Sequence, residues 1–175
     1  MRKILLVLIA VLLLVAGCGS EPKKEPPKAK SFGMDINTFV NKYNNVAKDA
    51  QDTVFLIGKA TIEEGTKGKV LKHEFSPNCI LIIAESNEAK NVDNVSTIAS
   101  PKTPKDLAFF MVQQAAVVGV LHPNMPKEKR ADLLYNLKIL GNNNIKGLNE
   151  STIVDNVLYT AKETGGVITI IATPK

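Results

Sequence analysis

The N-terminal stretch constrains this 175-residue chain most, because it is not expected to join the folded part. Arg2 and Lys3 carry positive charge, and residues 4–16 form an uninterrupted apolar run of 13 residues. A charged start, a short apolar run and small residues after it are typical of a secretory signal, which is removed from the mature protein. The run is too short for a membrane-spanning helix, which needs about 20 apolar residues. We therefore expect the fold to lie beyond residue 17.

Small residues followed by a cysteine close this stretch, in the order Val15-Ala16-Gly17-Cys18. The pattern resembles the lipobox of bacterial lipoproteins, and the resemblance covers residues 1–18 only. In that family a diacylglycerol is joined to the cysteine sulfur, a peptidase cuts just before the cysteine, and an amide-linked acyl chain such as palmitate can follow. The resemblance implies cleavage between Gly17 and Cys18 and a lipid anchor on Cys18. It also implies a place on the cell membrane, facing outside the cytoplasm. Two acyl chains are enough for stable attachment.

A hydrophilic tether is expected next, so the chain divides into a signal at 1–17, the lipid-bearing Cys18 with a disordered tether at 18–33, and one domain at 34–175. The tether is rich in proline and lysine and has hardly any large apolar residue. Six of the 22 basic and two of the 17 acidic residues precede residue 32, which leaves a net charge of +1 for the rest. That balance offers no basic surface for nucleic acid, and we expect none to bind.

Apolar spacing predicts a helix over 35–51, capped by Asp35. Strands are expected at 53–64, 69–75, 79–84 and 92–99, separated by turn signals. The run of 79–84 is apolar throughout, which is typical of a central strand covered on both faces.

The second half begins with a strong helix start. Thr103 is the expected cap and Pro104 the first helical residue. The helix is apolar nearly all round over 107–121, which favours burial in the core or in an oligomer interface. A second helix is expected over 126–140, stopped by Gly141. Two strands at 152–161 and 167–173 should then form a terminal hairpin.

Few side chains suggest catalysis or metal binding. His73 and His122 lack cysteine or carboxylate neighbours at zinc-ligand spacing, so we expect each to be solvated or to satisfy a helix cap. Glu63 and Glu64 are adjacent on a strand and should point to opposite faces, which argues against a shared acid–base role. Neither catalytic nor metal-binding residues, and no cofactor, are predicted.

Cys79 opens the apolar strand, and we expect it to be buried and unreactive rather than a nucleophile paired with a histidine. Because no internal disulfide is available, stability must come from packing. A serine at position 79 is expected to cost more than an alanine, since its hydroxyl would have no obvious partner.

The order of the expected elements predicts an α+β fold, with a mostly antiparallel sheet, an N-terminal helix and a central helical pair packed on it. We expect a non-enzymatic module that binds a protein or a small ligand outside the cytoplasm, in a groove between the sheet and the helices of 104–140. One alternative is a structural or accessory subunit of an envelope complex, with the 107–121 helix in its interface. A small hydrolase is a third hypothesis, disfavoured by the lack of a nucleophile–base pair.

Overall fold

The computed structural model describes residues 30–49, 55–141 and 145–175, and it is an α+β fold, as predicted. The lipobox, the cleavage site and the tether up to residue 29 lie outside the described residues. The helical elements are α2 (Ile36–Asp49), α3 (Pro104–Leu121), the 3-10 turn η2 (Lys127–Lys129) and α4 (Asp132–Asn136). The strands are β1 (Thr61–Glu64), β2 (Gly68–Ser76), β3 (Cys79–Ser86), β4 (Val92–Ala99), β5 (Asn149–Val154), β6 (Val157–Thr164) and β7 (Val167–Pro174).

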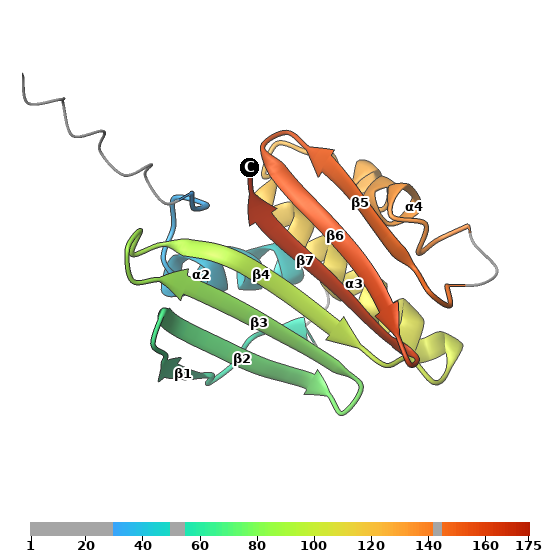
Figure 1. Ribbon diagram of the computed structural model, residues 1–175, viewed down its shortest axis with the longest axis horizontal. Helices are drawn as coiled ribbons and strands as arrows, with labels where there is room; N and C mark the ends of the chain where they lie inside the picture. The colour runs from blue at the N-terminus through green and yellow to red at the C-terminus, as the bar shows by residue number, and fades with distance from the viewer. Residues whose placement is uncertain (1–29, 50–54, 142–144) are drawn as a thin grey trace, which may run out of the picture.

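All seven strands belong to one antiparallel sheet in the order β1-β2-β3-β4-β7-β6-β5. Each half is a meander, and the β4–β7 pair joins the two halves after the chain has crossed through α3. Figure 1 shows α2 and α3 behind the sheet, on one side of it. Side chains that point to this side, such as Leu81, Ile83 and Ile170, are almost fully buried and form the core.

Both long helices begin with the caps that the sequence indicates. The Asp35 carboxylate accepts a hydrogen bond from the Thr38 N–H at 2.7 Å. Thr103 and Asp106 form a complete capping box, with Pro104 at the first helical position. These bonds satisfy N–H groups that a helix otherwise leaves unpaired.

The nearly all-round apolar character of α3 is explained by burial on several sides. Residues 116–120 are buried without exception. A Cβ on Gly119 would come within 2.5 Å of the Arg130 guanidinium and 2.9 Å of a Val46 methyl group, so α2 and the η2–α4 segment close on this turn of the helix. The helix was expected to lie either in the core or in an oligomer interface. Its burial within the chain accounts for its apolar composition without an interface. None of the described helices is long and apolar enough to cross a membrane.

The strand expected over 53–64 is wrong except at its end, where β1 covers Thr61–Glu64. Residues 53 and 54 lie outside the described residues. Phe55 and Ile57 are buried, as their apolar character suggests, but the backbone of Ile57 has a side chain as its partner. The Asn44 amide accepts from the Ile57 N–H at 2.8 Å and donates to its carbonyl at 2.9 Å. One amide of α2 thus takes the place of a neighbouring strand.

The helix expected over 126–140 is also wrong, because only η2 and the short α4 form. Lys138 has a left-handed backbone, with φ of 55°. The Ile139 N–H bonds to the Leu134 carbonyl and the Lys138 N–H to the Tyr135 carbonyl, which is the Schellman pattern that ends helices. The helix stops before Gly141, at a residue type that rarely adopts this conformation.

The single strand expected over 152–161 is in fact a hairpin, β5 and β6. Val154 pairs with Val157, and Asp155 and Asn156 form the two-residue turn between them. Asp155 has φ of 50°, a conformation that aspartate and asparagine tolerate better than most residues. The terminal β6–β7 hairpin forms as predicted around Gly165 and Gly166.

β3 is a central strand, but the prediction that both its faces are covered is wrong. Cys79, Leu81 and Ile83 are buried under the helices, while Ile80 and Ile82 are only half-buried on the opposite face of the sheet. No described element covers that second face.

Candidate ligand-binding cleft

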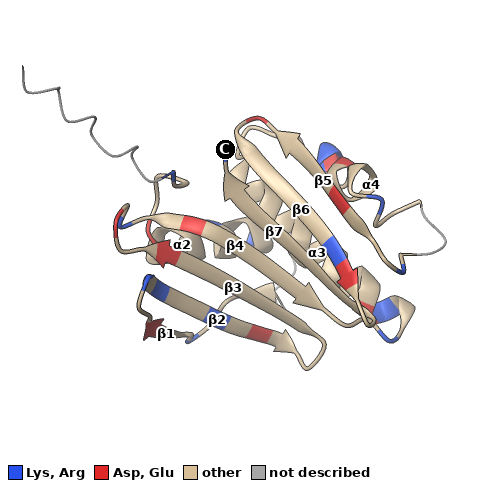
Figure 2. Cartoon of the chain, viewed as in Figure 1, with Lys and Arg blue, Asp and Glu red and all other residues tan. Residues whose placement is uncertain are grey.

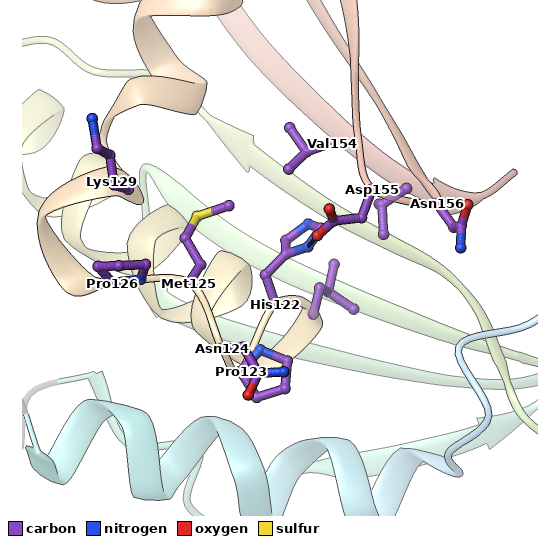
Figure 3. Close-up of a pocket in the computed structure, with 11 residues that line it drawn as sticks. His122, Pro123, Asn124, Met125, Pro126, Lys129, Val154, Asp155 and Asn156 are labelled. Atoms are coloured by element: carbon purple, nitrogen blue, oxygen red, sulfur yellow. Dashed lines mark hydrogen bonds and ion pairs between the residues drawn. The ribbon is translucent and has the colours of Figure 1, made fainter.

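A cleft of about 640 Å³ opens where the C-terminal end of α3 meets the β5–β6 turn. Its walls are residues 121–126, Lys129 and residues 154–157. Figure 3 shows His122 and Asp155 pointing toward each other on one side of it, with Lys129 on the other side and Met125 between them. A groove was expected between the sheet and the helices of 104–140, but core side chains fill that space, and the cleft lies at the end of the layer.

His122 is the central polar residue of the cleft. It is 5% exposed, and both ring nitrogens have partners. Nδ1 lies 3.0 Å from Oδ2 of Asp155, and Nε2 lies 2.8 Å from the Tyr159 hydroxyl oxygen. A carboxylate can only accept, so Nδ1 donates to Asp155; in the neutral imidazole Nε2 then accepts from the Tyr159 O–H. His122 is the C-cap residue of α3, and its backbone N–H bonds to the Val118 carbonyl, but its ring is neither solvated nor bonded to the helix end. The imidazole instead connects two residues more than thirty positions away.

Tyr159 closes the inner end of this chain of hydrogen bonds. Its side chain is fully buried. Burial raises the pKa of the Tyr159 hydroxyl well above its usual range, and the negative charge of Asp155 adds to the effect. The phenolate is therefore strongly disfavoured, and the hydroxyl serves as a hydrogen-bond donor to His122.

Asp155 forms the outer end, at the cleft mouth. Its side chain is 78% exposed, and Oδ2 is fixed by His122. Oδ1 accepts no hydrogen bond from the described residues, so it can accept one from a bound molecule. Leu121, Met125 and Val157 provide apolar wall around it. The cleft thus combines one oriented carboxylate with an apolar lining, the combination that small-molecule sites use for orientation and affinity.

The rim opposite Asp155 carries one lysine, which has an acidic neighbour. Lys129 of η2 lies 3.4 Å from the Asp132 carboxylate, and both side chains are more than half exposed. Such an exposed pair is weak and open to exchange. The amide side chains of Asn124 and Asn156 add hydrogen-bonding capacity.

The structure brings none of the other histidine, cysteine and glutamate candidates into this cleft. His73 on β2 stacks edge-on against Phe75, with ring centroids 4.5 Å apart, and burial lowers its pKa. Glu63 and Glu64 are exposed on the edge strand β1. Within the described residues no group of three or more His, Cys, Asp or Glu side chains could hold a metal ion.

Cys79 is buried, as predicted, and burial raises the pKa of its thiol to about 12. Its Sγ donates to Oε1 of Gln113 on α3 at 2.6 Å. The expectation that a serine hydroxyl would lack a partner here is therefore wrong, because Gln113 offers an acceptor. The thiol acts as a core group with one polar contact.

A second cleft, also of about 640 Å³, lies between residues 145–147, Pro101 and the β6–β7 turn. Its polar centre is Glu163, which is 9% exposed. One carboxylate oxygen accepts from the Gly147 N–H and the other from the Gly166 N–H. The pKa of Glu163 is lowered by these two hydrogen bonds, and the bond from Gly147 contributes most. The carboxylate fastens a loop to a hairpin turn.

Comparison with known proteins adds no functional information. No family model matches the chain, and no curated protein and no solved structure is similar to it at the significance required. The functional argument therefore rests on the lipobox pattern and on the geometry of the cleft.

Proposed function

We propose that this protein is a lipoprotein, anchored to the cell membrane through Cys18, which binds a small ligand outside the cytoplasm without catalysing a reaction. The anchor is supported by the lipobox pattern of Val15 to Cys18 and the charged, apolar segment before it. The binding role is supported by the cleft at the end of α3. The single observation that carries it is the Asp155 carboxylate, held at the cleft mouth by a buried histidine.

The cleft lining defines the kind of ligand. Asp155 can accept a hydrogen bond from a donor and favours a cation, because its oxygen is oriented and negatively charged. Leu121, Met125 and Val157 favour an apolar body next to that group. We therefore propose a small amphiphilic ligand with a protonated amine on an apolar stem.

Binding is favoured over catalysis by the state of Tyr159. Carboxylate, imidazole and hydroxyl in a row are the arrangement of nucleophilic hydrolases. Here the hydroxyl is fully buried, and its pKa is raised, so a substrate carbonyl would have no access to a nucleophilic oxygen. Cys79 is likewise buried, with an amide and not a base beside it. Neither side chain meets the requirements of a nucleophile.

The anchor is tested by metabolic labelling with a fatty acid. Wild-type protein should incorporate the label and mature by cleavage, whereas Cys18→Ala should incorporate none and accumulate as precursor. Cys79→Ala is the matched control, since it removes the other cysteine and should leave labelling intact. Label in the Cys18→Ala protein would contradict the anchor.

The binding role is tested by native mass spectrometry of the full chain extracted from its membrane in mild detergent. We expect a bound amine in the wild-type protein and in Glu63→Gln, which removes a carboxylate from the exposed edge strand. Asp155→Asn should release it, because asparagine keeps the turn but loses the charge. Equal retention by Asp155→Asn and Glu63→Gln would show that the cleft is not the site.

A further inference from the structure

The face of the sheet that the helices leave open is unusual in its composition. On an antiparallel sheet with one covered face, the other face is ordinarily polar. Here Ile80 and Ile82 of β3, Ile98 of β4 and Ile171 of β7 all lie on the open face and are half-buried. On β3, β4 and β7 the residues that pair with these isoleucines are uncharged. Figure 2 shows β7 without any charged residue.

The pairing register fixes how these residues lie relative to one another. One row across the sheet consists of Lys72, Ile82, Ser96, Ile171 and Thr160, from β2 to β6. The next row consists of Glu74, Ile80, Ile98, Thr169 and Lys162. On the other side of the first row lie Val70, Ala84 and Asn94, continued by Thr173 and Leu158. We call these three rows the open face.

We propose that the open face is the interface of a homodimer, in which a second copy of the chain packs its own open face against it about a twofold axis that runs along β4. With such an axis, each row faces the same row of the second copy in reverse order. β3 then lies opposite β7 of the second copy, and β2 lies opposite its β6. Ile82 then faces Ile171 of the second copy, and Val70 faces its Leu158. Ile98, which lies on the axis, faces its own counterpart.

Charge complementarity supports this occupant. The same rotation places Glu74 opposite Lys162 of the second copy, and it does so twice. Within one copy Glu74 contacts Lys72 at 2.8 Å, with more than half of each side chain exposed, and Lys162 has no ion pair among the described residues. Both residues stand two strands from the axis, about 10 Å, so their long side chains can accommodate the roughly 30° angle at which two sheets pack.

The size of the open face also suits a dimer. Five strands of about eight residues span roughly 600 Å² in projection, before the relief of the side chains is counted. A standard interface takes about 800 Å² from each partner, so this face is of the right order. An unrelated partner or a lipid surface would not require apolar and charged residues to match under one rotation. The cleft at His122 lies at the end of α3 on the helix side and stays open in such a dimer.

Cross-linking in the membrane tests the axis. The full chain with Ile98→Cys should form a covalent dimer on mild oxidation or with a short bismaleimide, because the two thiols meet on the axis. Ile153→Cys is the matched control: it is 47% exposed on β5, far from the axis, and should remain monomeric. Wild-type protein controls for the native cysteines. A covalent adduct of Ile98→Cys with a different protein, or no adduct, would overturn the proposal.

Charge reversal tests the pairing without disturbing the core, since both positions are exposed. We expect Glu74→Lys alone and Lys162→Glu alone each to weaken the detergent-solubilised dimer by about tenfold or more, because like charges then face each other. The double variant Glu74→Lys with Lys162→Glu should restore it. Sedimentation measures the dissociation constant of all three. Single variants that dimerise like the wild type, or a double variant as weak as the singles, would exclude this interface, whatever the ligand of the cleft.

Discussion

The cleft at His122 and the cleft at Glu163 have the same volume of about 640 Å³ and each contains a carboxylate, but the two carboxylates differ in burial and in hydrogen bonding. Glu163 is almost fully buried, and its two oxygens accept from backbone N–H groups of Gly147 and Gly166. Asp155 is mostly exposed, and one of its oxygens is held by His122. Both oxygens of Glu163 therefore accept hydrogen bonds from the fold itself, whereas Oδ1 of Asp155, which accepts none from the described residues, can accept one from water or from a bound molecule.

The difference between these clefts is one of hydrogen-bond satisfaction rather than of size or charge. A buried carboxylate needs partners that compensate for the loss of water. Glu163 finds them in two turns, and in doing so holds those turns together. At the cleft at α3, His122 donates a hydrogen bond to one oxygen of Asp155, as the two glycine N–H groups do to Glu163. The Asp155 carboxylate nevertheless remains exposed at the cleft mouth.

The largest expected effect comes from His122→Ala. It opens a cavity in the wall of the cleft and leaves the buried Tyr159 hydroxyl without its acceptor, so we expect a loss of about 3 kcal/mol in the free energy of unfolding. Urea denaturation measures it. His73→Ala, which removes a half-buried ring that contacts Phe75, should cost clearly less. Equal losses for the two variants would show that the hydrogen bonds of His122 contribute little.

Tyr159→Phe separates the hydrogen bond from the packing. The ring stays, but Nε2 of His122 loses the O–H that it accepts from, and we expect a cost of about 1.5 kcal/mol. The same denaturation experiment measures it, and the proton resonances of His122 should shift. An unchanged midpoint would mean that water takes the place of the hydroxyl.

Glu163→Gln tests the structural cleft through its pH dependence. The folded state lowers the pKa of Glu163 below its ordinary value of 4.5, so the carboxylate contributes stability at neutral pH that is lost as the pH falls through the folded pKa. The variant should therefore be less stable than the wild type at neutral pH, and the gap should close in acid. Thermal denaturation over a pH series measures it. A gap that stays constant would mean that the hydrogen bonds do not depend on charge.

Asp155→Asn should have the smallest effect on folding. The side chain is exposed, asparagine suits the left-handed turn, and its amide oxygen can still accept from His122, so we expect a change of less than about 0.5 kcal/mol. Binding of an amine should nevertheless be lost. A large loss of stability would place Asp155 with Glu163 as a structural carboxylate and would remove the contrast between the two clefts.

Local signals were enough to predict the α+β class, both helix starts and the β6–β7 hairpin. Thr103, Pro104 and Asp106 fix the start of α3 by contacts within its first turn. Gly165 and Gly166 form the turn between β6 and β7, two strands that are adjacent in the sequence. The misassigned segments depend on contacts distant in sequence. Ile57 is apolar enough for a strand, but its backbone partner is Asn44, and nothing in the 53–64 segment indicates that amide.

The candidate cleft could not be predicted for a similar reason. His122, Asp155 and Tyr159 come from a helix end, a turn and a strand, and only the fold brings them together. The one local signal was Asp155-Asn156, two turn-forming residues inside an apolar stretch, and reading them as a turn would have split the expected strand.

The backbone just before α2 determines how tension would enter the domain. The Phe32 N–H bonds to the Val92 carbonyl at 2.8 Å, and the Val92 N–H bonds to the Met34 carbonyl at 2.7 Å. If the protein is held at Cys18, a pull away from the membrane first meets these two bonds, which join the segment before α2 to the first residue of β4. A pull along the chain would therefore load these two hydrogen bonds and the start of α2 before it reaches the strand-to-strand bonds of the sheet.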